Sequence, residues 1–141
     1  MINVVIDTNV FVSALMSTEG ASFRVLSLID SGKFQVNVSI PLVVEYESAA
    51  KRFLGTKIQL SEKAVDDLID YFCSVAQRHN IHFLWRPILN DPRDELVLEL
   101  AVSAECQFIV THNISDFQGS EQFGVSAITP KEFLARIGGL P

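Results

Sequence analysis

The chain has 141 residues, of which 48% are hydrophobic, and it carries a formal net charge of −6. This length predicts one domain over residues 1–141 with a single substantial core, and the hydrophobic content excludes a disordered chain. The acidic balance excludes a protein that wraps nucleic acid with a broad basic surface, but a nuclease remains possible because metal-binding carboxylates themselves add negative charge.

No apolar run approaches the roughly 20 residues that span a bilayer, and the amino terminus shows no basic segment followed by a cleavage site. We therefore expect a cytoplasmic protein with no membrane partner. The two cysteines, Cys73 and Cys106, lie in apolar helical patterns. Buried free thiols are expected there, rather than a disulfide or a metal site.

The first predicted strand, residues 3–6, ends in three consecutive β-branched residues, which is typical of a strand buried on both faces. Asp7 follows it, at the carboxyl end where open α/β sheets bind ligands. A helix is predicted over residues 10–16, with either Thr8 or Asn9 as its cap. Taken alone, the segment Asp7-Thr8-Asn9 is equally well a polar turn between a strand and a helix.

The rest of the chain alternates between helix and strand without a linker or repeat. Such alternation predicts a three-layer α/β/α domain, with a central, mainly parallel sheet of about five strands covered by helices on both faces. The further predicted helices are 23–29, 41–54, 61–78, 91–105 and one from 130 onward, and the further strands are 34–38, 81–85, 108–110 and 123–128.

Glu45 stands out on the predicted helix 41–54, because it shares a face with Leu42 and Ala49. An acid on a buried face is rare unless it is paired or bound to a metal. The alternative is that Glu45 lies at the edge of the apolar face and reaches water. Glu47 is predicted to point toward solvent and to pair with Lys51, four residues later.

Two aspartates open the predicted helix 91–105. Capping explains Asp91, and the helix dipole explains an acid such as Asp94 in the first turn. Asp94 also precedes Val97 by three residues, so it leans toward the packed face. Glu95 and Glu99 are predicted to point toward solvent.

A second polar turn follows the predicted strand 108–110. Thr111 can donate a hydrogen bond to a nearby carboxylate, and Asn113 and Asp116 can point over the same sheet edge as the first turn. Asn and Asp are also common in turns for backbone reasons alone. His112 has no partner at a readable spacing and is interpreted as an ordinary loop histidine.

These four stretches, in this order and spacing, resemble the four motifs of PIN-domain ribonucleases. The resemblance covers essentially the whole chain and is greatest to the stand-alone bacterial or archaeal members grouped as toxins of toxin–antitoxin systems. It implies a PIN-like fold and hydrolysis of RNA to a 5′-phosphate and a 3′-hydroxyl. The matching segments are Asp7-Thr-Asn, Ser39 with Glu45 six residues later, Asp91-Pro-Arg-Asp94 with the helix after it, and Val110-Thr-His-Asn-Ile-Ser-Asp116-Phe.

Carried over by position, the resemblance implies that the catalytic and metal-binding acids are Asp7, Glu45, Asp94 and Asp116. It implies supporting roles for Asn9, Thr111 and Asp91. Many relatives carry Asp where this chain has Asn113. Asn113 is therefore expected to complete a second metal site only weakly.

Carboxylates that converge on one point repel one another, and a divalent cation removes that conflict. Ligands that are all oxygen atoms select Mg²⁺ or Mn²⁺, which can activate water and offset charge on a phosphodiester in hydrolysis. Single-stranded RNA is the expected substrate, because its scissile bonds are exposed. The candidate cations for its phosphates are Lys51, Arg52, Arg86 and Arg93. Trp85 could stack a base, whereas Tyr46 is assigned to the core.

Two other functions remain open from the sequence. A haloacid-dehalogenase-like phosphatase also places Asp after its first strand, but it usually carries a second Asp where this chain has Asn9. A non-catalytic protein-binding module of the same fold would be expected to have lost two or more of the acids. The resemblance further implies a homodimer and an antitoxin protein as partner, and the sequence does not identify the RNA.

Overall fold

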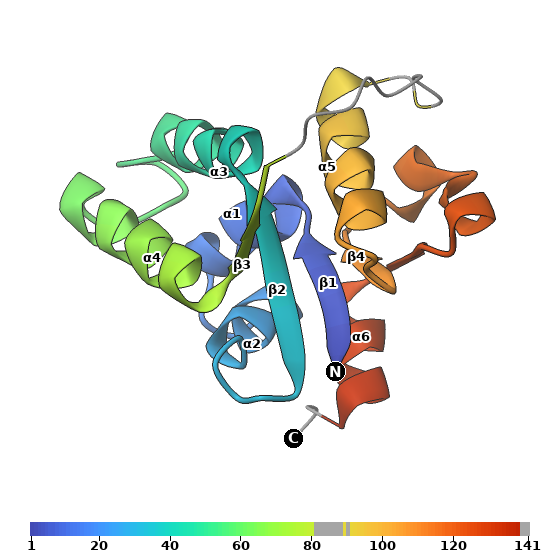
Figure 1. The fold of residues 1–141 in the computed structure, drawn as a ribbon. Coiled ribbons are helices and arrows are strands. Elements are labelled where there is room, and N and C mark those ends of the chain that lie inside the picture. The colour runs from blue at the N-terminus through green and yellow to red at the C-terminus, as the bar shows by residue number, and fades with distance from the viewer. Residues whose placement is uncertain (81–88, 90, 139–141) are drawn as a thin grey trace.

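The computed structural model describes residues 1–80, 89 and 91–138. Its centre is a five-stranded sheet in the order β3-β2-β1-β4-β5, in which every neighbouring pair is parallel (Figure 1). The predicted parallel α/β architecture is therefore confirmed. The strands are β1 (Ile2–Ile6), β2 (Phe34–Ser39), β3 (Gln77–His79), β4 (Phe108–Val110) and β5 (Ser126–Ile128).

Helices cover the sheet on both faces and complete the three layers (Figure 1). The helix α5 packs against β1, β2 and β4, whereas the helices before β3 pack on one another and α2 also contacts α6. Two 3₁₀ turns, η1 (Ile114–Phe117) and η2 (Ser120–Phe123), follow β4. The helices are α1 (Thr8–Met16), α2 (Ala21–Ser27), α3 (Ile40–Arg52), α4 (Glu62–Val75), α5 (Pro92–Ser103) and α6 (Pro130–Ile137).

The core lies on both sides of β1. Val4, Val5 and Ile6 are each fully buried, as the run of β-branched residues predicted. Phe11 of α1 stacks on Tyr46 of α3 with ring centroids 4.5 Å apart, which joins two helices of one layer beneath the end of β1. No helix in the described part of the chain is long and apolar enough to span a membrane.

The predicted end of the helix at residues 61–78 is wrong. The helix α4 ends at Val75, and Gln77 and Arg78 belong to β3, where they pair with Asn37 and Val38 of β2. The amide of Gln35 donates to the carbonyl of Val75 over 3.0 Å and so holds the helix end beside the sheet. This pairing with a distant strand overrides the local helical pattern, and the strand predicted at 81–85 lies outside the described residues.

The last strand is also shorter than predicted. It begins at Ser126, and Phe123 belongs to the 3₁₀ turn η2 instead. Gly124 follows with φ 80°, a left-handed backbone conformation that glycine adopts without strain. A change of backbone direction at this glycine separates the turn from the strand.

Candidate active site

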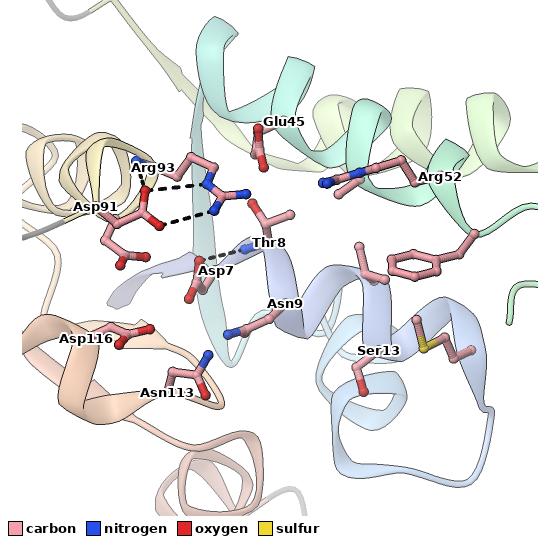
Figure 2. Close-up of a pocket in the computed structure, with 15 residues that line it drawn as sticks. Asp7, Thr8, Asn9, Ser13, Glu45, Arg52, Asp91, Arg93, Asn113 and Asp116 are labelled. Atoms are coloured by element: carbon pink, nitrogen blue, oxygen red, sulfur yellow. Dashed lines mark hydrogen bonds and ion pairs between the residues drawn. The ribbon is translucent and has the colours of Figure 1, made fainter.

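A cleft of about 480 Å³ opens at the carboxyl edge of the sheet, a size typical of ligand sites (Figure 2). Its floor is formed where β1 and β4 end. These strands are neighbours in the sheet, and the chain leaves β1 toward β2 on one side and reaches β5 from β4 on the other. Ligands of open α/β sheets bind at such a switch point, because the crossovers diverge and leave a crevice.

Asp7 lies at the centre of this floor and is 7% exposed. One carboxylate oxygen accepts the Thr8 backbone N–H over 2.8 Å, and the other accepts the Thr111 hydroxyl over 2.8 Å. Asp7 is itself the cap of α1, which begins at Thr8. The prediction that Thr8 or Asn9 caps a helix beginning at Val10 is therefore wrong, because the acid before them takes that position.

Thr111 links Asp7 to the turn after β4. Its hydroxyl oxygen accepts the Asn113 backbone N–H over 3.0 Å and lies 3.5 Å from the Asn9 amide nitrogen. The Asn9 amide oxygen accepts the His112 backbone N–H over 3.3 Å. The predicted hydrogen bond from Thr111 to a carboxylate is thus confirmed, and the two polar turns are held in one network.

His112 remains outside the cleft. Its Nε2 lies 2.9 Å from the Ser22 hydroxyl of α2, and burial lowers the pKa of the imidazole. This contact fastens the turn after β4 to α2. It supports a structural role for His112, in line with the interpretation from sequence.

The other predicted acids line the cleft from three elements. Ser39 caps α3 by accepting the Leu42 N–H, which sets the start of the helix that carries Glu45. Glu45 and Asp94 are half-buried, and Asp116 lies in η1. All three line the same cleft as Asp7. None of the three side chains makes a hydrogen bond or salt bridge within the described part of the chain.

The acids influence one another electrostatically. Desolvation, followed by the charges of Asp7 and Asp116, raises the pKa of Asp94 to about 6. Desolvation also raises the pKa of Asp7, although its hydrogen bonds from Thr111 and Thr8 act in the opposite direction. The carboxylates are therefore close enough to disfavour one another's charged forms, which is the conflict that a bound cation would remove.

Arg93 brings a positive charge to the same cleft. Its guanidinium lies 3.2 Å from the Asp91 carboxylate, and Figure 2 shows it extending from α5 toward the side of the cleft that carries Glu45. The hydrogen bond with Asp91 raises the pKa of Arg93, and the charges of Asp91, Glu45 and Asp94 raise it further. Asp91 caps α5 through the Arg93 backbone N–H, which together with the guanidinium holds the pKa of the Asp91 carboxyl below its ordinary value.

The other candidate cations lie in different settings. Lys51 forms salt bridges with Glu47 at 2.9 Å, Asp66 at 3.2 Å and Glu62 at 3.4 Å, and it does not line the cleft. Its predicted pairing with Glu47 is confirmed. Arg52, the next residue, lines the cleft. Arg86 and the aromatic Trp85 lie outside the described residues.

Two side chains behave in ways that the sequence did not indicate. Tyr46 is in the core as predicted, but its hydroxyl also donates to the Ile6 carbonyl, one residue before Asp7. Glu95 was predicted to face solvent, yet it is 8% exposed and accepts the Leu89 backbone N–H. The prediction for Glu95 is wrong because its carboxylate binds the backbone of Leu89, which precedes the helix, instead of water. The sequence signal for the Tyr46 contact was a tyrosine on the buried face of the helix, because a buried hydroxyl needs a hydrogen-bond partner.

The donor set fits a hard divalent cation in its chemistry. The described residues that line the cleft offer carboxylate, amide and hydroxyl oxygens and include no cysteine or histidine. As the side chains stand, no group of three or more Asp, Glu, His or Cys among the described residues is close enough to form a ready-made metal site. A cation would therefore have to draw the carboxylates of the helices toward Asp7.

Comparison with known families gives a match that agrees with this geometry. Residues 3–115 match a family model described as PIN domain. The matched range contains β1 from Asn3 onward, the helix α3 that carries Glu45, α5 and the start of η1. No curated protein matches the chain.

Proposed function

This chain belongs to the PIN domain family, whose members are in general nucleases, and we propose that it is a metal-dependent ribonuclease acting on single-stranded RNA. The observation that supports the proposal most directly is the placement of Asp7, Glu45, Asp94 and Asp116 around one cleft at the switch point of the sheet.

In this proposal the four carboxylates would hold Mg²⁺ or Mn²⁺, which when bound supplies an activated water and offsets charge on the phosphodiester. The hydrogen bonds from Thr8 and Thr111 orient both oxygens of Asp7 before any ligand arrives. Asn113 offers an amide oxygen at the same edge but no charge. A second ion would consequently bind more weakly than the first.

The cations of the cleft favour a single strand over a duplex. Arg93 and Arg52 are the positively charged residues among its described lining, which is too few to neutralise the two backbones of a duplex. A single strand needs fewer such contacts and can lay an exposed phosphodiester against the acids. In this proposal Arg93, which lines the cleft with Glu45 and Asp94, would contact the phosphate that is cleaved.

Purified protein should cut unstructured RNA in Mg²⁺ or Mn²⁺ and should lose this activity in EDTA. Asp7→Asn is the matched control, because it keeps the size of the side chain and removes its charge, and it should be inactive with metal present. Cleavage by the wild type that survives exhaustive chelation, or equal cleavage by Asp7→Asn, would overturn the proposed mechanism.

We further propose that the enzyme is the toxin of a toxin–antitoxin pair, acting as a homodimer that an antitoxin protein inhibits. Only the family membership supports this role. Expression of the wild type should arrest bacterial growth and expression of Asp7→Asn should not. Normal growth with an active, soluble enzyme would overturn the toxin role while leaving the ribonuclease intact.

A further inference from the structure

The cleft extends beyond the acids to a second end with a different character. We infer that this end binds the nucleotide next to the scissile phosphodiester, with its base against Phe53 and its phosphate at Arg52. The inference rests on the proposed ribonuclease function and adds a binding subsite to it. We call this region the Arg52 end, and it is lined by Val12, Ser13, Met16, Ala49, Arg52 and Phe53.

The composition of the Arg52 end contrasts with that of the acidic end, by which we mean the part of the cleft lined by Asp7, Glu45, Asp94 and Asp116. Its described lining residues include no carboxylate, and apart from Arg52 and Ser13 they are apolar. Met16 is 37% exposed, so apolar surface faces the solvent here. An apolar wall beside one cation suits a nucleotide, which joins a flat base to a charged phosphate.

Arg52 is available for a ligand in a way that its neighbour is not. Lys51 is occupied by three acids, whereas Arg52 is exposed and makes no salt bridge within the described residues. Figure 2 shows the Arg52 side chain running along the cleft toward Glu45, opposite to the approach of Arg93 from α5. The two arginines therefore approach Glu45 from opposite sides (Figure 2), as contacts with two successive phosphates of one strand would require.

Phe53 provides a firmly held surface for a base. Its carbonyl oxygen accepts the Ile58 N–H over 2.9 Å, the Thr56 N–H over 3.1 Å and the Thr56 hydroxyl over 3.0 Å. The turn that carries the ring is thus fixed before a ligand binds, which lowers the entropic cost of binding. Lys57 lies over the ring with its Nζ 5.6 Å from the centroid and adds positive charge near this surface.

The test measures, by fluorescence anisotropy in Ca²⁺, the binding of a short single-stranded RNA labelled with fluorescein. The same measurement is made on a series of RNAs that each carry one abasic nucleotide, at a different position in each RNA. Phe53→Leu and Arg52→Ala should each weaken binding roughly tenfold, because they remove a stacking surface and a phosphate contact respectively. Phe53→Tyr keeps an aromatic ring and should bind like the wild type. Wild type should show a loss of affinity at one abasic position, and Phe53→Leu should not.

Arg136→Ala is the matched control, because Arg136 is also an exposed arginine in the last turn of a helix, with its guanidinium 5.2 Å from the centroid of the Phe108 ring. It should bind RNA as the wild type does. In cleavage assays, Arg52→Ala should raise KM and leave kcat nearly unchanged, as expected for a contact made equally before and during the reaction. Melting temperatures identify any variant that is simply misfolded.

The outcomes separate this inference from the proposed function. If the wild type cleaves RNA and both variants bind and cleave with unchanged affinity and KM, the subsite is wrong and the ribonuclease stands. The subsite is equally wrong if the abasic profile of Phe53→Leu matches that of the wild type. If the wild type neither binds nor cleaves RNA, both proposals fall.

Discussion

The two sides of the acidic end are held in very different ways. On the strand side, Asp7 has a hydrogen bond at each carboxylate oxygen, and Thr111 and Asn9 tie it to the neighbouring strand end. On the helix side, Glu45 and Asp94 make no hydrogen bond or salt bridge within the described residues. Asp7 is therefore fixed by the sheet, whereas the carboxylates of Glu45 and Asp94 are free to adjust.

This difference suggests how the site can bind a cation without a preformed cage. In the proposed enzyme, a fixed Asp7 would define where the ion lies, because its orientation is set by hydrogen bonds that are present without metal. The carboxylates of the helices can then rotate toward the ion and lose their mutual repulsion. The sheet would thus fix the position of the ion, and the carboxylates on the helices would adjust to it.

The largest effect on activity is expected from a change to a carboxylate on the helix side. Glu45→Gln should lower kcat by orders of magnitude, because it removes a charged ligand from the cleft. Glu47→Gln should stay near wild type, since Glu47 is exposed and paired with Lys51 at 2.9 Å. Steady-state cleavage of one RNA by both variants gives the comparison, and equal losses would mean that the helix side is not where the charge is needed.

A smaller loss is expected on the strand side. Thr111→Val removes the hydroxyl that lies 2.8 Å from Asp7 and should reduce activity and metal affinity roughly 10- to 100-fold, as for other residues that orient a ligand. Thr111→Ser keeps the hydroxyl and should recover most of the loss. Mn²⁺ affinity measured by calorimetry tests this directly. Full activity in Thr111→Val would show that Asp7 needs no such support.

Asn113→Asp alters the number of charges at the site. The added carboxylate should strengthen binding of a second ion and, through repulsion, lower the stability of the metal-free protein at neutral pH. Calorimetric titration with Mn²⁺ and melting temperatures with and without metal measure both effects. If neither the metal binding nor the metal-free stability changes, Asn113 does not point toward the acids.

The smallest expected effect is on the stability of the metal-free protein. The pKa of Asp94 is about 6 in the fold, above its ordinary value of 3.8. Its stabilising contribution is thus complete below the ordinary value and is lost as the pH rises through 6. Asp94→Asn should be more stable than the wild type near pH 7.5, by about 1 kcal/mol after allowance for solvent screening.

This stability gain should shrink at acid pH, because the wild-type carboxyl is then protonated. Melting curves of both proteins in EDTA near pH 7.5 and near pH 4 check the prediction. A gain of the same size at both pH values would indicate a packing effect instead of relief of charge repulsion.

The sequence by itself determined the layered α/β architecture and the edge of the sheet at which the candidate site lies. The apolar run of β1 predicted a central strand, and the polar turns after β1 and β4 predicted a shared edge. The helical period separated Glu45 from Glu47 on α3. These features depend on residues close together in the chain, so local periodicity and the direction of parallel strands are sufficient to predict them.

Only the tertiary structure decided the contacts made by segments far apart in the chain. Gln77 and Arg78 form a strand, β3, because they pair with the backbone of β2. Lys51 is occupied by acids of α4, whereas the adjacent Arg52 lines the cleft. Tyr46 reaches the Ile6 carbonyl across forty positions of sequence. Each of these outcomes depends on which surfaces meet after the helices pack, and no local pattern of residues encodes that.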